Sequence, residues 1–390
     1  MGYKPAIVVV AYRRLYALER LLNSIDRAYY EEDDIELIIS IDYHDENHDV
    51  INYANGFEWK HGNKLVVTHK KNMGLRNHII ECGNYSQKYG SIILLEDDDY
   101  VSEGYYYYTK SIQDFFADDK HVAGVSLYGF ERNEFACKRF QPIKYNYDTY
   151  FGQFSCTRGE SWTKEQWHSF IEWYNENPEI KEDNLMPSVV YTWKKSWGKY
   201  FLKYLVETNK YYVVPYVGYS TVYGEKGTHS SQIELDVQVA LSHGVEDIRI
   251  APFDRGAHYD AFFENVDIKH ALAELLGVEK EKIAVDLFGL ENRVFDGKKY
   301  VLSTSRINRK IIKEYDLNMR PHEENVVLNM YGTGIFLYDN EVKKYNAKKS
   351  RRMNYDFAGM RGPYAIKYGV CHCAKVLANV TRKLIERIIR

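Results

Sequence analysis

Continuous apolar runs in the N-terminal region predict the strands of a parallel sheet. They span residues 6–11 and 91–95, and such runs are typical of strands buried on both faces; residues 35–41 and 64–68 are further strand candidates. Between the strands expected at 6–11 and 35–41, apolar residues recur at helical spacing from Leu15 to Ile25. A second helical segment precedes the last run. This order predicts an open α/β sheet whose loops meet at one edge.

The run at residues 91–95 ends in four consecutive carboxylates, Glu96, Asp97, Asp98 and Asp99, which we call the acidic motif. Adjacent carboxylates at a buried strand end repel one another unless a cation shares their field. Oxygen ligands suit a hard divalent ion such as Mg²⁺ or Mn²⁺. Because α/β proteins bind ligands at the carboxyl ends of their strands, the motif indicates a metal site. A solvated acidic loop is the alternative.

Charged residues also follow the first two strands. Arg13 and Arg14 lie just after the first run, where an anionic ligand would meet them. Asp42 ends the second of these strands. Surface arginines are the alternative reading for the basic pair.

Together these motifs resemble the glycosyltransferases of the GT-A fold, particularly family 2. The resemblance rests on a Tyr-x-Arg loop at Tyr12 to Arg14, a strand ending in Ser-Ile-Asp at Asp42, an Asn-x-Gly-Leu turn at Asn72 to Leu75, and the acidic motif. It covers roughly residues 5–230. It implies a nucleotide-sugar-binding and catalytic domain over residues 1–230, with a UDP-sugar favoured as donor.

The same resemblance assigns roles to single residues. It places the metal-binding acids of the family on Glu96, Asp97 and Asp98, with Asp98 as the direct ligand, and the extra Asp99 leaves the register ambiguous. Asp42 would hold the nucleobase or ribose, and Arg14 would lie near the diphosphate.

Aromatic residues cluster between positions 147 and 173. Trp167, Phe170 and Trp173 share one helical face, which favours a core helix. Tyr150 and Trp162 are candidates for stacking on an acceptor sugar, because sugar C–H faces pack well on aromatic rings.

The family resemblance also implies a late metal ligand and a catalytic base. His229, in a Gly-Thr-His loop, would return to the metal; a histidine that only contacts backbone is the alternative. The family often has Asn-x-Gly before this loop, whereas this chain has Val222-Tyr223-Gly224. An inverting transfer needs a carboxylate base near the acceptor hydroxyl, for which Asp183 and the competing Glu160 are the candidates.

Residues 231–345 form an accessory α+β segment in this interpretation. A helix capped by Asp267 is expected to end at Gly277. Short strands are expected over the ranges 245–250, 283–287, 299–303, 325–328 and 334–338, which predicts a β-rich appendage.

Residues 346–390 form a basic tail. Residues 341–390 carry a net charge of +10, which leaves −13 on the rest of a chain whose total is −3. An apolar stripe from Leu377 to Ile388 lies between basic residues, a pattern typical of a helix attracted to anionic lipid. Lys348, Lys349, Arg351 and Arg352 add positive charge upstream. A helix that dimerises or docks on the core is the alternative.

Composition places this chain among globular proteins, with 45% hydrophobic and 27% charged residues in 390. Five cysteines without a CxxC pair fit a reducing cytoplasm. We see no secretion-signal pattern at the N-terminus and no apolar stretch long enough to span a membrane. The expected location is the inner face of the plasma membrane, bound peripherally, and no nucleic-acid partner is expected.

These features predict a metal-dependent, inverting hexosyl- or hexosaminyltransferase that acts on a lipid-linked glycan in bacterial surface polysaccharide synthesis. One alternative is a sugar nucleotidyltransferase, although Ala11 to Arg14 lacks the glycine-rich loop usual in that class. A scaffold or glycan-binding module is the non-enzymatic alternative.

Overall fold

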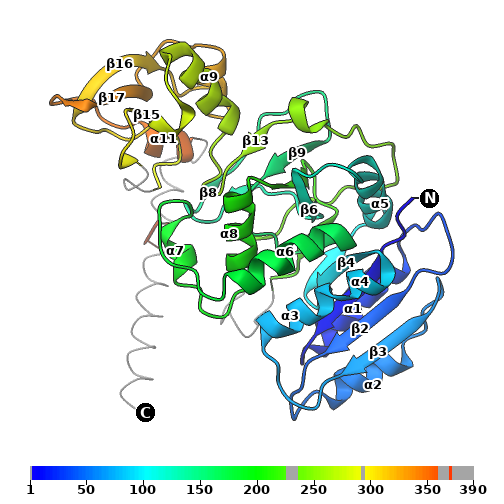
Figure 1. The fold of residues 1–390 in the computed structure, drawn as a ribbon. Coiled ribbons are helices and arrows are strands. Elements are labelled where there is room, and N and C mark those ends of the chain that lie inside the picture. Colours follow the sequence, from blue (N-terminus) through cyan, green and yellow to red (C-terminus); the bar gives the residue numbers. More distant parts are fainter. Residues whose placement is uncertain (1, 225–235, 291–294, 359–368, 371–390) are drawn as a thin grey trace.

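The computed structural model describes residues 2–224, 236–290, 295–358 and 369–370. Its N-terminal half alternates strands and helices (Figure 1). The elements are β1 (Ala6–Ala11), α1 (Leu15–Asp26), β2 (Leu37–Ile41), α2 (His48–Gly56), β3 (Lys64–Thr68), α3 (Leu75–Gly83), α4 (Tyr85–Tyr89) and β4 (Ser91–Glu96).

The middle of the chain completes the same layered structure. Its elements are β5 (Asp99–Val101), α5 (Tyr105–Phe115), β6 (Val122–Ser126), β7 (Arg132–Asn133), β8 (Lys138–Arg139), β9 (Thr149–Gly152), β10 (Glu160–Thr163), α6 (Lys164–Glu176), α7 (Ser188–Tyr191), α8 (Gly198–Thr208), β11 (Tyr211–Pro215), β12 (Ser220–Val222), a 3₁₀ turn η1 (Phe253–Arg255) and β13 (His258–Tyr259).

One nine-stranded sheet organises these elements, in the order β13-β9-β11-β6-β10-β4-β1-β2-β3. β1 pairs in parallel with both β2 and β4, and β2 pairs in parallel with β3. β10 is antiparallel to both β4 and β6. The predicted fold class is therefore confirmed as mixed α/β, with a large central sheet flanked by helices, an arrangement consistent with the GT-A fold.

Alternation along β1 shows how the sheet is covered. Ile7 and Val9 face a core that includes Leu18 and Leu22 of α1. Val8 and its alternate neighbours face the opposite core, which includes Ile79 of α3. Successive side chains of a strand point to opposite faces, so a strand between two helical layers must be apolar at every position. That requirement explains the unbroken apolar runs of the sequence.

A smaller C-terminal unit, residues 266–358, follows the large sheet (Figure 1). Its four strands have the order β14-β15-β17-β16, and α9 packs on them. The elements are α9 (Val266–Leu276), a 3₁₀ turn η2 (Lys280–Lys282), β14 (Ile283–Asp286), β15 (Tyr300–Ser303), β16 (Arg309–Tyr315), α10 (Glu324–Val327), β17 (Ile335–Lys343) and α11 (Arg352–Asp356). The predicted β-rich appendage is thus present.

Several predicted elements are wrong in detail. Residues 325–328 lie in and just after helix α10, and residues 245–250 form no strand. β16 was not expected from the sequence. The cap of α9 is Asn265, whose side chain accepts the Ile268 N–H, in place of Asp267. The periodicity of such short segments fits more than one kind of secondary structure. Contacts with distant parts of the chain decide which one forms.

The predicted domain boundary after residue 230 is too early. β13 lies beyond it and still joins the large sheet by pairing with β9. The predicted terminal amphipathic helix lies outside the described residues. Among the residues that the structure describes, no helix is long and apolar enough to cross a membrane.

Candidate functional site

Parallel pairing brings the predicted donor residues to one edge of the sheet. Val10 of β1 lies opposite Glu96 of β4, and the backbone N–H of Asp97 donates to the carbonyl of Val10 over 3.0 Å. On the other side, the N–H of Asp42 donates to the carbonyl of Ala11 over 3.0 Å. The loop that leads to α1 starts from the same edge. The ends of β1, β2 and β4 therefore lie side by side, as predicted for a ligand site.

Arg14 bridges two carboxylates of the acidic motif. Its Nη1 donates to Asp98 Oδ2 over 2.8 Å, and its Nη2 donates to Asp97 Oδ1. Burial raises the pKa of Asp97 to about 6, against the opposing attraction of Arg14. The two carboxylates raise the pKa of Arg14 despite its own burial. The sequence predicted that a cation would balance the acidic motif. In the structure, the guanidinium of Arg14 balances part of that negative charge.

The carboxylate of Asp42 accepts hydrogen bonds from nearby backbone N–H groups. Its Oδ1 accepts the N–H groups of Tyr43 over 2.8 Å and Met73 over 2.9 Å, and its Oδ2 accepts the N–H of Gly74 over 3.1 Å. Gly74 has φ 76°, in the left-handed region that favours glycine. Asp42 therefore holds the Asn72 to Leu75 turn in place beside the site. The role in nucleoside binding that the resemblance implies stays a prediction.

Three further carboxyl groups lie beneath this surface, of which Asp99 and Glu160 are buried and Glu96 is half-buried. Burial raises the pKa of Glu96 to about 8 and raises the pKa values of Asp99 and Glu160 well above their ordinary range. Asp99 Oδ2 accepts the backbone N–H of Glu96 over 2.9 Å. That bond gives the extra acid of the motif a structural position, since Asp99 is buried and bends the chain back over the end of β4.

Arg158 is a functional candidate that the sequence analysis missed. Its side chain is only 16% exposed, its attraction lowers the pKa values of Glu96, Asp99 and Glu160, and it pairs with Glu134. Its guanidinium also lies 4.9 Å from the centre of the Tyr128 ring. The sequence gives little sign of this role, because Glu160 is two positions away but Glu96 and Asp99 come from a distant part of the chain.

Tyr223 lies against the acidic motif as well. Val222 of β12 pairs with Asp99 of β5, and the Tyr223 N–H donates to the carbonyl of Asp98 over 3.0 Å. The ring of Tyr223 lies 3.6 Å from the guanidinium carbon of Arg20 on α1. The segment that departs from the family pattern is therefore part of this site. His229 lies outside the described residues.

The acidic motif could supply part of the coordination of a divalent ion. Asp97 Oδ2 is buried and has no hydrogen-bond partner among the described residues, and the side chain of Asp98 is 22% exposed. These carboxylates could supply two oxygen ligands, with a bound diphosphate and water supplying the others. Within the described part of the chain, no group of three or more His, Cys, Asp or Glu residues is placed to hold a metal ion. A metal would therefore depend on the donor to complete its coordination.

The two candidate bases differ sharply in environment. Glu160 lies in β10, is fully buried, and has no hydrogen-bond partner at either carboxylate oxygen in the described structure. Asp183 is partly exposed, pairs with Lys203, and accepts hydrogen bonds from the Tyr191 hydroxyl and the Leu185 N–H. Those donors hold the pKa of Asp183 below its ordinary value, against the effect of burial.

The acceptor-stacking prediction for Tyr150 and Trp162 is wrong, because both side chains are 0% exposed. Tyr150 belongs to β9 and Trp162 to β10, and both pack in the main core. The Trp162 indole N–H donates to the Tyr212 hydroxyl over 3.2 Å. Trp167 and Phe170 are buried core residues of α6, as the helical spacing predicted.

Comparisons with known proteins found likeness only among solved structures. No protein-family model matches the chain, and no curated protein matches its sequence. S. aureus TarS residues 1–349 in complex with UDP has 14% identity and a TM-score of 0.30, over 54% of this chain and 57% of that one. GalNAc-T7 with UDP, GalNAc and Mn²⁺ has 13% identity and a TM-score of 0.37, over 54% and 41%.

A third solved structure is the mannosyltransferase PcManGT from Pyrobaculum calidifontis in complex with GDP-Man and Mn²⁺. It has 14% identity and a TM-score of 0.28, over 44% of this chain and 46% of that one. The matches therefore span about half the length of these proteins or less. TM-scores of this size do not carry an argument about function, which rests instead on the geometry of the site.

Proposed function

We propose that this protein is a glycosyltransferase that uses a nucleotide-diphosphate sugar, with a UDP-sugar favoured. The observation that carries the proposal is the pairing of Arg14 with Asp97 and Asp98 at the carboxyl ends of neighbouring parallel strands. A cation and a partly exposed carboxylate at the same strand edge are what a diphosphate and its metal ion require.

Each residue of the site is proposed to bind a different part of the donor. Arg14 turns from the carboxylates to the diphosphate when the donor binds, since a guanidinium pairs well with phosphate oxygens. Asp98 and Asp97 then hold Mn²⁺ or Mg²⁺, with Glu96 oriented toward the nucleoside and His229 as a further ligand. The metal, when bound, neutralises charge that develops on the departing diphosphate. Asp42 holds the turn against which the nucleobase or ribose lies.

Asp183 is the proposed base of an inverting transfer. Its lowered pKa keeps it ionised at neutral pH, and an ionised carboxylate is the form that accepts a proton from an acceptor hydroxyl. Glu160 is not retained in this role, because its buried carboxyl group has a pKa well above the ordinary range.

The acceptor and setting follow from the sequence resemblance and remain proposals. They are transfer of a hexosyl or hexosaminyl group to a lipid-linked glycan, in bacterial surface polysaccharide synthesis. Peripheral attachment at the cytoplasmic membrane face would rest on residues 375–390. Three of the basic residues upstream pair within the C-terminal unit: Lys348 with Glu314, Arg351 with Asp316 and Arg352 with Asp356. Arg352 is also buried, so its predicted membrane-facing role was wrong.

Donor turnover tests the proposal. Nucleotide sugars are screened by thermal shift with and without Mn²⁺, because a true donor stabilises the folded state by mass action. Metal-dependent release of nucleoside diphosphate that is lost in Asp98→Ala supports transfer. Release of pyrophosphate from a nucleoside triphosphate and a sugar phosphate would identify a nucleotidyltransferase instead. Glycan binding without turnover of any donor would indicate a scaffold.

A further inference from the structure

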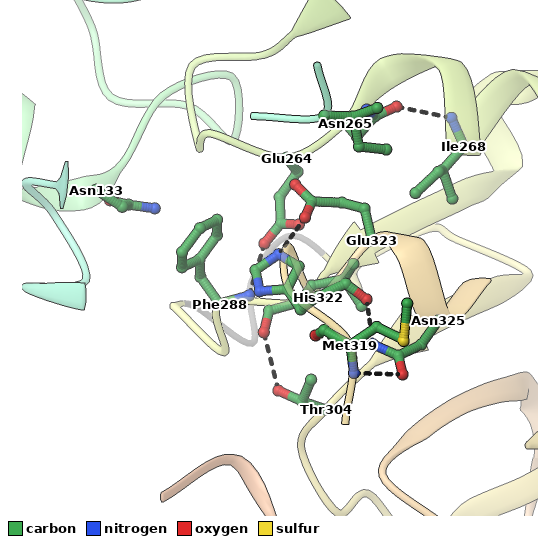
Figure 2. Close-up of polar contacts among 12 residues, drawn as sticks. Asn133, Glu264, Asn265, Ile268, Phe288, Thr304, Met319, His322, Glu323 and Asn325 are labelled. Atoms are coloured by element: carbon green, nitrogen blue, oxygen red, sulfur yellow. Dashed lines mark hydrogen bonds and ion pairs between the residues drawn. The ribbon is translucent and has the colours of Figure 1, made fainter. Parts of the chain in front are cut away.

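A second polar site lies where the C-terminal unit meets the short β7–β8 hairpin, far along the chain from the acidic motif. Figure 2 shows His322 between the ring of Phe288 and the carboxyl group of Glu323. A pocket opens beside these residues and is also lined by Arg139, Arg320 and Asp356. We call it the junction pocket, because Arg139 belongs to β8 and the other residues to the C-terminal unit.

Hydrogen bonding fixes the proton position on His322. Arg352 Nη1 lies 2.7 Å from His322 Nδ1, and a guanidinium can only donate. Nδ1 must therefore accept, which places the proton of the neutral imidazole on Nε2. That Nε2 is buried and has no hydrogen-bond partner in the described structure; the nearest carboxylate oxygen, Glu323 Oε2, is 3.5 Å away. His322 is among the residues that line the pocket, so this lining includes an N–H donor that no described residue uses.

Glu323 provides a second unused group. Its side chain is 1% exposed, and neither carboxylate oxygen has a hydrogen-bond partner among the described residues. Burial raises the pKa of Glu323 to about 8, although Arg352 and Tyr259 oppose the shift. At neutral pH this carboxyl group is largely protonated, so it too can donate a hydrogen bond.

The remaining charges at the junction favour an anion. Asp356 is compensated, because its Oδ1 lies 2.7 Å from Arg352 Nε and its Oδ2 lies 3.5 Å from Lys138 Nζ. Arg320 lies over the ring of Tyr355, donates to its carbonyl over 2.9 Å, and forms no ion pair among the described residues. Arg139 is exposed and forms no ion pair within the described ranges.

We propose that the junction pocket binds an oxyanion, a phosphate or carboxylate group, between the guanidinium groups of Arg139 and Arg320 and the donors of His322 and Glu323. A tetrahedral or planar oxyanion offers acceptor oxygens to all four side chains and neutralises the two arginines. The group belongs to free phosphate or to a charged saccharide. This site is separate from the donor site and does not require the proposed transfer reaction.

Calorimetric titration of the full-length protein, without nucleotide sugar, tests the proposal. The probes are inorganic phosphate, glucose 1-phosphate, glucuronate and uncharged glucose. We expect saturable binding of one or more of the charged probes and none of glucose. Equal affinity for both phosphates identifies the bare phosphate group as the ligand, whereas tighter binding of a charged sugar identifies a saccharide.

Variants locate the binding. Arg139→Gln should weaken the binding of the charged probe at least tenfold, because an exposed charge is removed without disturbing the core. Arg27→Gln, at another exposed arginine, is the matched control and should bind normally. Absence of saturable binding by every charged probe, or binding that Arg139→Gln leaves unchanged, would overturn the proposal. Donor hydrolysis by Arg139→Gln should equal that of the wild type, so failure here is distinguishable from failure of the proposed function.

Discussion

The guanidinium of Arg14 and the carboxylate of Asp98 face each other at the carboxyl edge of the large sheet, with Nη1 2.8 Å from Oδ2. The two residues follow the neighbouring parallel strands β1 and β4 and are 84 positions apart in sequence. An arginine that already lies on the acidic motif is positioned to change partner when a diphosphate arrives. This pair therefore gives the most direct tests of the proposed site.

Replacing Arg14 should weaken donor binding. Arg14→Gln is expected to raise the dissociation constant for a UDP-sugar at least about tenfold, because a charge-assisted contact to the diphosphate is lost. Arg13→Gln, at the exposed neighbouring arginine, serves as the control and should change affinity much less. Calorimetry in the presence of Mn²⁺ measures both. Equal effects of the two substitutions would mean that only the net charge of the loop matters.

Removing the metal should abolish turnover. We expect chelation by EDTA to lower the release of nucleoside diphosphate by about a hundredfold or more, with recovery on addition of Mn²⁺, because the leaving group would lose its stabilising charge. Asp98→Asn should show the same loss without recovery. Its thermal stability serves as the control, since the Asp98 side chain is partly exposed. Full activity in EDTA would contradict metal dependence.

Trp162 should behave as a core residue. Trp162→Ala is expected to lower the free energy of unfolding by about 3–5 kcal/mol, because a large buried ring and its hydrogen bond to Tyr212 are both lost. Urea denaturation gives the value. Tyr16→Ala, at a ring that is 77% exposed, is the control and should change stability by less than about 0.5 kcal/mol. A small loss in Trp162→Ala would show that the ring is not packed as described.

Glu323 should make stability depend on pH. Its pKa is raised from 4.5 to about 8 in the folded protein. Below pH 4.5 Glu323 is protonated in both the folded and the unfolded protein. Between pH 4.5 and about 8 it ionises only in the unfolded chain. The free energy of unfolding therefore falls as the pH rises toward 8.

Glu323→Gln removes that titration. Relative to the wild type, this variant should gain on the order of 4 kcal/mol in free energy of unfolding between pH 5 and pH 8.5, since about three pH units lie below the folded pKa and each corresponds to about 1.4 kcal/mol. Urea denaturation across this pH range measures the gain. Glu274→Gln, at an exposed glutamate, is the control and should show no such trend. A constant difference between Glu323→Gln and wild type would mean that Glu323 is ionised throughout.

The large sheet was predictable because its causes are local. A strand covered on both faces must be apolar at each position, so the runs at β1, β2 and β4 are visible in the sequence alone. Parallel order then places their following residues at one edge, and Arg14, Asp42 and Asp98 lie there as expected.

Burial and partner choice were decided by the tertiary structure. Trp162 and Glu160 both lie in β10, which inserts antiparallel between β4 and β6, and nothing in the local pattern reveals that insertion. Likewise, Arg352 reads as a basic tail residue until folding places it beside His322 and Asp356. Local sequence determines which segments can be strands or helices, whereas the desolvation and pairing of a charged side chain depend on residues far away in the chain. Only the assembled fold brings those residues together.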